Sequence, residues 1–387
     1  MAEQSRSART TLLRLMPVAT FVILGLILII FISSDAPAWA TPAERAAGTL
    51  PIIRGTVHLQ GRPPKPAPSW SVPLVVTLHD PGNPIPAYTY NTNTDQYGNF
   101  VVTHPVSGTY VCDIRVKNLH TLRNVKSNVT LVPDDNDLNF GVLREGDANN
   151  DNYVSIVDFS ILVTTYDKGS SQPGFDPRAD FNENQWIEIA DFSLLATNFD
   201  AHGDIPVSSS SLTDNLTETL TLKLQPAFYT APRQSIFTID LRLDPKGQLF
   251  HGVAVVLAFN PQELQVVDEA GNPVTAITPG NILPVLIANE VNNETGEIHF
   301  AAGVLGSPPP SPTTEFSLGT IRFKAMQVNL EGSDVKFLIQ DYPPKTGVSY
   351  EGYYLPIEVI DLQVRIPELR LLWPLFLKGH RTLPSVE

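Results

Sequence analysis

Oxygen-bearing side chains recur in two twelve-residue segments, DANNDNYVSIVD starting at Asp147 and DFNENQWIEIAD starting at Asp180. A calcium loop of this length takes its ligands from positions 1, 3, 5, 7 (through the backbone carbonyl), 9 and 12. In the first segment these positions hold Asp147, Asn149, Asp151, Tyr153, Ser155 and Asp158. In the second they hold Asp180, Asn182, Asn184, Trp186, Glu188 and Asp191. Three carboxylates per loop, with no Cys or His, suit a hard divalent cation and disfavour zinc, so the spacing predicts two Ca²⁺ sites.

The two segments belong to one duplicated unit with an offset of 33 residues, in which SIVDFSILVTTYD and EIADFSLLATNFD agree at 7 of 13 positions without a gap. Apolar residues follow each loop at the spacing i, i+3, i+4 and i+7, which predicts one helical face per copy. These residues are Phe159, Leu162, Val163 and Tyr166 in the first copy, and Phe192, Leu195, Ala196 and Phe199 in the second. Two Asp/Asn-rich turns that cap ordinary helices are the alternative interpretation.

Alternating strands are expected on both sides of this unit. Apolar residues alternate along segments such as 110–116 and 237–243, whereas no long helical period occurs between 51 and 143 or between 226 and 366. Cys112 is expected to point from its strand into the core of the first β region. The predicted fold class is mostly β and multidomain, with two antiparallel β-sandwiches joined by a small all-α duplicated calcium loop–helix module. The predicted parts are a β-sandwich at 51–143, the loop–helix module at 144–200, a Ser-rich linker at 201–225, a β-sandwich at 226–366 and a tail at 367–387.

Composition limits the classes of function. The chain has 26 Lys and Arg against 40 Asp and Glu, a net charge of -14, so it lacks the basic field that nucleic-acid binding needs. Only 17% of its residues are charged, 34 are Pro, and the single Cys excludes an intrachain disulfide scaffold. This composition indicates an extracellular β-rich protein.

The N-terminus predicts export. Arg6, Arg9 and Arg14 precede 20 uncharged residues that end before Asp35, and Ala-Pro-Ala-Trp-Ala follows at 36–40. Residues 1–40 are therefore expected to be a signal peptide cleaved after Ala40, or a signal anchor in which 15–34 stay in the membrane. Either outcome places the rest of the chain outside the cell or at the cell surface. The apolar segment at 369–380 is expected to be an extra strand or a surface-attachment tail.

Residues 146–200, with their duplicated calcium loops and helices, resemble type I dockerins, the modules that bind cohesin domains. The resemblance implies partner recognition at loop positions 10 and 11, which are Ile156, Val157, Ile189 and Ala190 here. We expect two near-equivalent apolar patches, so that a single substitution is masked; the alternative is that these residues pack on the preceding sandwich. Dockerins carry Gly at loop position 6, where this chain has Asn152 and Gln185, and the second site is therefore expected to bind calcium more weakly.

The two β regions also resemble known domains. SIFTIDLRLD, VAVVLAFNPQELQVV, TPGNIL, NNETGEIHFAAGVL and GTIRFKA resemble the strands of cohesin domains over residues 226–365. GTVHLQG, DQYGNF and SGTY, from Gly55 on, resemble prealbumin-like sandwiches of the carboxypeptidase-regulatory type. Together with the dockerin resemblance, these segments imply an organisation similar to that of cellulosome scaffoldins.

No catalytic signature accompanies these segments: HExxH, CxxC, a P-loop, GxGxxG and GxSxG are all missing. We therefore expect a non-catalytic, exported, calcium-binding adaptor of the cohesin–dockerin type, associated with extracellular polysaccharide degradation. Its expected partners are cohesin- and dockerin-bearing proteins and polysaccharide, with membrane contact only through the N-terminal segment. The alternative is a carbohydrate-binding or adhesive surface protein with Trp70, Tyr88 and Tyr90 as a sugar platform.

Overall fold

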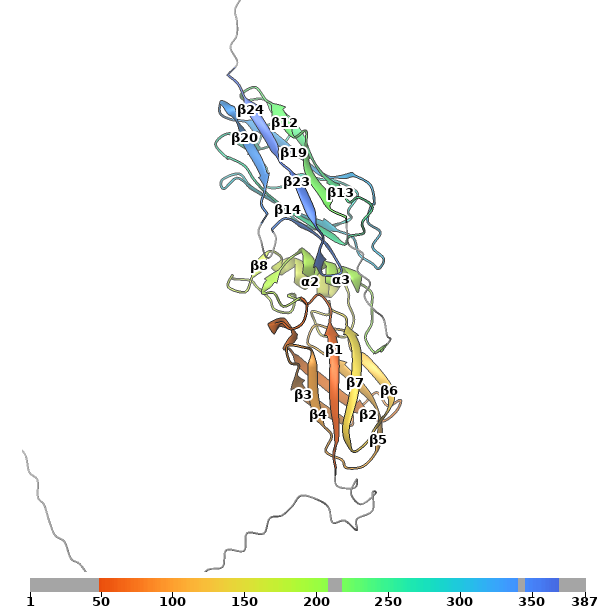
Figure 1. The fold of residues 1–387 in the computed structure, drawn as a ribbon. Coiled ribbons are helices and arrows are strands. Elements are labelled where there is room, and N and C mark those ends of the chain that lie inside the picture. The colour runs from red at the N-terminus through yellow and green to blue at the C-terminus, as the bar shows by residue number, and fades with distance from the viewer. Residues whose placement is uncertain (1–48, 208–217, 340–344, 369–387) are drawn as a thin grey trace, which may run out of the picture. The chain divides into compact units, whose positions relative to one another are not determined.

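The computed structural model describes residues 49–207, 218–339 and 345–368, and Figure 1 shows their helices and strands. The predicted export signal at 1–40 and the segment 369–380 lie outside these residues. Within the described part of the chain, no helix is long and apolar enough to cross a membrane. Strands dominate the regular elements, which confirms the predicted mostly β class.

The first sandwich packs two sheets around one core. Its elements are β1 (Pro51–Leu59), the 3-10 helix η1 (Pro68–Trp70), β2 (Pro73–His79), β3 (Tyr88–Asn93), β4 (Asn99–Thr103), β5 (Tyr110–Lys117), β6 (Asn124–Leu131), β7 (Asp134–Leu143) and, later in the chain, β10 (Ile205–Pro206). The strand orders are β4-β1-β7 and β10-β6-β5-β2-β3. The pairs β1–β7 and β6–β10 are parallel, so the prediction of a purely antiparallel sandwich is wrong for these strands.

Burial in this sandwich follows the predicted alternation. Cys112, which was expected to face the core, is fully buried on β5, and burial raises the pKa of its thiol to about 12. Trp70 is 1% exposed, and its indole Nε1 donates to the Pro63 carbonyl at 2.9 Å. Tyr88 and Tyr90 are half-buried against the same core. Because Trp70 lies inside the core, it cannot form the sugar platform that the alternative hypothesis needs.

Each predicted calcium loop leads into a short helix, as the periodicity indicates: α2 (Ile156–Thr165) follows the first loop and α3 (Ile189–Thr197) the second. Both helices begin with a capping box, formed by Ser155 with Asp158 and by Glu188 with Asp191. The acidic residue that ends each loop therefore also fixes the first turn of its helix. Two short strands, β8 (Lys168–Gly169) and β9 (Trp186–Ile187), pair between the copies.

The two helices differ in burial. α2 buries Leu162 and exposes its opposite side, as expected for an amphipathic helix. α3 is buried at every position from Ile189 to Ala196, so the prediction of a single buried face is wrong for this copy. The cause is that α3 shares its apolar cluster with residues of α2 and also with Ala254, Ile287 and Ala301 of the second sandwich.

The second sandwich also consists of two sheets. Its strands are β11 (Leu220–Gln225), β12 (Phe228–Thr230), β13 (Ile236–Asp244), β14 (Gly252–Ala258), β15 (Leu264–Val266), β16 (Thr278–Pro279), β17 (Val285–Asn292), β18 (Glu297–Gly303), β19 (Phe316–Ala325), β20 (Asn329–Phe337), β21 (Gly347–Tyr350), β22 (Tyr353–Tyr354), β23 (Ile357–Ile360) and β24 (Leu362–Ile366). The main strand orders are β15-β19-β13-β11-β23 and β12-β24-β20-β14-β18-β17, with parallel pairs at β11–β23 and β12–β24.

The predicted linker at 201–225 is shorter than expected. At its start, β10 pairs with β6 of the first sandwich. At its end, β11 is a strand of the second sandwich, in which Leu220, Leu222 and Leu224 are buried. The alternation of these leucines was the available signal, but the polar composition around them outweighed it in the prediction.

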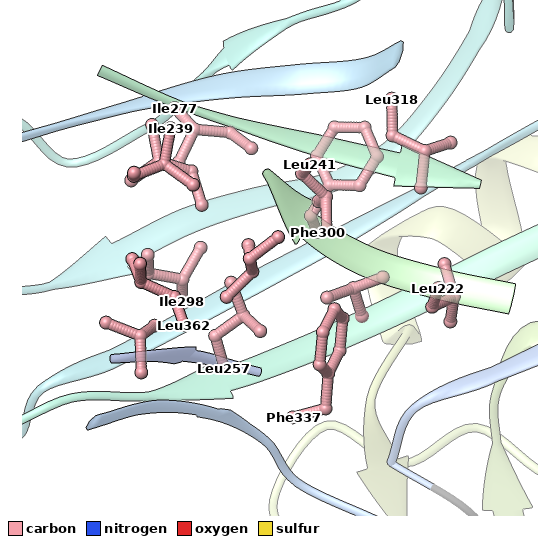
Figure 2. Close-up of a cluster of buried hydrophobic side chains, with 14 of the residues drawn as sticks. Leu222, Ile239, Leu241, Leu257, Ile277, Ile298, Phe300, Leu318, Phe337 and Leu362 are labelled. Carbon is pink, nitrogen blue, oxygen red and sulfur yellow. The ribbon is translucent and has the colours of Figure 1, made fainter. Parts of the chain in front are cut away.

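Figure 2 shows the core of the second sandwich, where apolar side chains from both sheets meet. Ile239 and Leu241 of β13 come from one sheet, and Leu257 of β14 and Ile298 of β18 come from the other. Ile239, Leu241 and Leu257 are fully buried. Each such side chain contributes about 1.5–3 kcal/mol on burial, so this layer holds the two sheets together without a disulfide.

Trp70→Ala should lower the free energy of unfolding by about 3–5 kcal/mol, because it leaves a large cavity and removes the bond to the Pro63 carbonyl. Ile85→Ala, at a side chain that is 71% exposed, should change it by no more than about 0.5 kcal/mol. Chemical denaturation of both variants measures the difference. Equal stabilities would contradict the position of Trp70 in the core.

Candidate calcium loops and docking faces

Main-chain N–H groups converge on the carboxylates of the first loop. Asp147 Oδ1 accepts from the Asp151 N–H at 2.9 Å, and Oδ2 accepts from the Asn152 N–H at 2.8 Å. Asp158 Oδ1 accepts from the Asn149 N–H at 3.0 Å. Asp147 and Asp158 are both fully buried. The loop is therefore wound around the side chains at positions 1 and 12.

The second loop repeats this pattern with an offset of 33 residues. Asp180 Oδ1 accepts from the Asn184 N–H at 3.0 Å, and Oδ2 accepts from the Gln185 N–H at 2.9 Å. Asp191 Oδ1 accepts from the Asn182 N–H at 3.1 Å. The same bonds at equivalent atoms indicate that the duplication extends to the conformation of the loops.

The backbone turns of the two loops are also equivalent. Positions 4 and 6 have positive φ in both: 63° at Asn150 and 70° at Asn152, against 52° at Glu183 and 73° at Gln185. Asn tolerates this left-handed conformation more readily than Gln does, so the second loop carries the larger backbone cost. Weaker calcium binding at the second loop remains a prediction.

The two copies bond to each other reciprocally. After α3, the Asp200 N–H donates to the Val154 carbonyl of the first loop at 2.9 Å. After α2, the Asp167 N–H donates to the Ile187 carbonyl of the second loop at 2.8 Å. Donors and acceptors of these two bonds are both offset by 33 residues, so an approximate two-fold relation links the copies. Each loop is completed by the chain that leaves the other copy's helix.

The oxygen ligands predicted for the second loop suit a hard cation. Glu188 is 8% exposed, and its Oε1 accepts from the Asn184 side chain at 2.5 Å. Its Oε2 makes no hydrogen bond of normal geometry. The Tyr354 hydroxyl is close enough to lower the pKa of Glu188. Burial nevertheless raises the pKa of Glu188 to about 7 and that of Asp180 to about 6. Buried carboxylates with an unused oxygen are stabilised by a bound cation.

Calcium would be held in each loop by the oxygen atoms that the spacing predicts. Within the described residues, no three His, Cys, Asp or Glu side chains gather as a metal cluster by themselves. Each predicted set instead includes Asn oxygens and a backbone carbonyl, which suit calcium better than a transition metal. Calcium binding itself remains a prediction.

The first sandwich brings positive side chains to both loops, which the sequence did not predict. Lys117 Nζ lies 2.5 Å from Asp147 Oδ2 in the first loop. Near the second loop, Arg62 Nη2 and His120 Nε2 each lie 3.5 Å from Glu183, and His120 Nδ1 lies 2.6 Å from Glu145.

Burial lowers the pKa of His120, but its contact with Glu145 outweighs this effect and raises the pKa to about 9. His120 therefore joins Arg62 as a second buried positive charge. These two form an ionic network with the buried Glu145 and the partly exposed Glu183. Such pairs are costly to break one partner at a time. The partners are far apart in the sequence, and no local pattern marks them.

The second sandwich binds the side of α3 that carries Ile189, Ser193 and Thr197, here called the α3 stripe. Ser349 Oγ donates to the Ile189 carbonyl at 2.8 Å, and the Gly352 N–H donates to Ser193 Oγ at 2.7 Å. The hydroxyl of Thr197 lies 3.3 Å from Nε2 of the buried His251. Glycine allows α3 to approach this face closely: a Cβ built on Gly252 would come within 2.7 Å of Ile189 Cδ1.

The equivalent side of α2 is uncovered. Ile156, Ser160 and Thr164, here called the α2 stripe, are exposed, with Ile156 at 61%, and the adjacent Val157 is 52% exposed. Its counterpart in the second copy is not: Ile189 is 1% exposed and Ala190 is fully buried. The prediction of two near-equivalent exposed patches is therefore wrong for Ile189 and Ala190. Ile189 packs on the sandwich that follows the module, not on the preceding one as the alternative proposed.

No protein-family model and no curated protein sequence matches this chain. Solved structures that are similar to it include cohesin domains. A type II cohesin domain from the cellulosome of Acetivibrio cellulolyticus is 18% identical over 38% of this chain and 95% of that domain, with a TM-score of 0.32. The type II cohesin dyad of the adaptor ScaA scaffoldin from the same organism is 20% identical over 38% of this chain and 48% of the dyad, with a TM-score of 0.32.

The seventh ScaB type I cohesin from Pseudobacteroides cellulosolvens is 12% identical over 40% of this chain and 96% of that cohesin, with a TM-score of 0.29. The resemblances of 146–200 to dockerins and of the first sandwich to prealbumin-like domains remain predictions. So do the polysaccharide partner and the lack of catalysis.

Asp158→Ala should weaken calcium binding at the first loop and destabilise the chain by at least about 2 kcal/mol, because a buried carboxylate leaves both the ligand set and the capping box. Ser155→Ala should have a smaller effect on calcium affinity, since position 9 often acts through water. Calorimetric titration with Ca²⁺ and thermal unfolding with and without chelator compare the two variants. Equal losses of calcium affinity would contradict the assignment of position 12.

Docking of α3 should make stability depend on pH through His251, whose pKa burial lowers to about 4. The ordinary pKa of histidine is about 6.5, so the unfolded chain binds more protons between these values. The stability present above about pH 6.5 should therefore fall as the pH drops towards 4, by up to about 3 kcal/mol. Unfolding free energies of wild type and His251→Gln across this range measure it; parallel curves would refute the effect.

Proposed function

We propose that this chain is a non-catalytic, exported, calcium-binding assembly adaptor whose loop–helix module docks on a cohesin-like sandwich of another protein through the α2 stripe. The observation that carries the proposal is the repetition of the α3 stripe. Its Ile189, Ser193 and Thr197 lie 33 residues after Ile156, Ser160 and Thr164, with identical residue types. One copy of this pattern is buried on a β-sandwich, and the other is exposed.

The contacts of α3 indicate what such a docking face requires. The second sandwich offers a hydroxyl to the carbonyl at the first position of the stripe and a backbone N–H to the Ser hydroxyl at its second position. It also offers glycines that allow the helix to approach closely. Because α2 carries the same Ile and Ser at the same spacing, a sandwich with these features is a suitable partner for it. Exposed apolar residues beside these polar groups form a small binding hot spot.

Docking of α3 within the chain changes the role expected of the second sandwich. That sandwich, which resembles cohesins in sequence, has its β14, β18 and β21 face covered by α3. We infer that it holds the module in place and that, within the described residues of the module, α2 offers the free docking face. As an adaptor, the chain would then bring a cohesin-like partner to the place where its N-terminal segment anchors it or to which that segment exports it.

Ile156→Asp should weaken binding to a cohesin-like partner by at least about 2 kcal/mol, which is roughly a thirtyfold increase in Kd. A single substitution should suffice, because the equivalent Ile189 is covered. Ile85→Asp makes the same change at another exposed isoleucine and should leave binding unchanged. Calorimetry with a panel of isolated type I and type II cohesin domains, in calcium and in chelator, measures the effect.

Two results would contradict the proposal. Binding of the Ile156→Asp variant at wild-type strength would exclude the α2 stripe as the docking face. Failure of the wild-type chain to bind any cohesin, together with retention on a polysaccharide panel, would favour the carbohydrate-binding class instead. A thermal melt of the Ile156→Asp variant checks that the loss of binding is not a loss of folding.

A further inference from the structure

Lys117, at the end of β5 in the first sandwich, places its ammonium group against the first calcium loop. Its Nζ lies 2.5 Å from Asp147 Oδ2 and also donates to the Thr121 carbonyl. The Lys117 side chain is 14% exposed and that of Asp147 is 0% exposed, so water screens this pair little. A positive charge that is largely shielded from water thus touches the residue at ligand position 1.

The second loop provides an internal comparison. Asp180 occupies the same position and accepts from the same two backbone N–H groups, those of positions 5 and 6. Among the described residues, no ion pair joins a Lys or Arg to Asp180. Arg62 forms ion pairs with Glu145 and Glu183 and donates to the Phe181 carbonyl. Its charge acts on Asp180 only at longer range, where it opposes the rise that burial causes in the pKa of that carboxyl. The two loops therefore differ in whether a cation from the protein already sits on the position 1 carboxylate.

Asp147 retains room for a metal ion in spite of Lys117. A carboxylate has about four acceptor sites on its two oxygens. Three are engaged here, by the Asp151 N–H on Oδ1 and by the Asn152 N–H and Lys117 Nζ on Oδ2. A cation could bind Oδ1, but the ammonium beside it would repel that cation and cancel part of the carboxylate charge.

We propose that Lys117 is a tethered cation that sets the calcium affinity of the first loop, weakening binding there and holding the loop folded when calcium is absent. The proposal rests on the calcium-binding role proposed above. It reverses the order of calcium affinities that the residues at loop position 6 predict for the two loops. The second loop, despite Gln185, has no lysine on its position 1 carboxylate and should be the tighter site.

Terbium luminescence can resolve the two loops, because position 7 is Tyr153 in the first and Trp186 in the second. Both residues contribute a backbone carbonyl in the predicted ligand sets, so Tyr153→Phe and Trp186→Phe identify each signal without removing a ligand. The full chain is titrated with terbium, and calcium is then added to displace it. This gives the calcium affinity of each loop separately.

Lys117→Met should raise the calcium affinity of the first loop about tenfold and leave the second loop unchanged. Lys117→Arg keeps the charge and should retain the wild-type affinity. Lys65→Met is the matched control, since Lys65 also donates to a backbone carbonyl of the first sandwich, that of Val57, and within the described part of the chain it forms no ion pair with either loop. In chelator, Lys117→Met should melt at a lower temperature than Lys65→Met, and saturating calcium should remove that difference.

An unchanged or weaker first loop in Lys117→Met would overturn the proposal. If that variant does not fold, Lys117→Gln keeps a donor for Asp147 without the charge, and a loss of first-loop binding in this variant would show that Lys117 is only a structural residue. If the wild-type chain gives neither terbium signal, the calcium role itself fails. The two failures are thereby distinguishable.

Discussion

The concentration of carboxylates in two tight loops is the constraint on which the rest of the structure depends. Asp147, Asp158, Asp180 and Asp191 are nearly or fully buried, and each is held by main-chain N–H groups of its own loop. Buried charges are tolerated only when they are paired or coordinate a metal. The loops in turn fix the first turns of α2 and α3, so the positions of both docking stripes follow from how these charges are satisfied.

The two sandwiches contribute to the module in different ways. The first supplies charge and hydrogen bonds: Lys117 pairs with Asp147, and Gln60 accepts from the Asn198 side chain at 2.7 Å. The second supplies a flat apolar face and the polar contacts of Ser349 and Gly352. The module is therefore not an independent bead between two spacers, because residues from both neighbours complete it.

Local patterns predicted most of the architecture. The duplicated spacing around Asp147 and Asp180 indicated both loops and helices, and alternation around Cys112 indicated a buried strand. The contacts between modules could not be predicted in this way. Ile156 and Ile189 look equivalent in the sequence, and only the packing of α3 on Gly252 separates an exposed residue from a buried one. The pairing of Lys117 with Asp147 likewise joins segments that share no local pattern. The parallel pair β1–β7 was missed for the same reason, since strand direction depends on the path of the chain between strands.

The reciprocal bonds between the copies have a consequence for how the module responds to its surroundings. Because the Asp200 N–H completes the first loop and the Asp167 N–H completes the second, neither copy closes its loop with its own residues alone. A chain that lost one copy would lose the closure of the other as well, which favours keeping the duplication intact. A change that opens either loop would therefore weaken the closure of both, whichever of the two binds calcium more tightly.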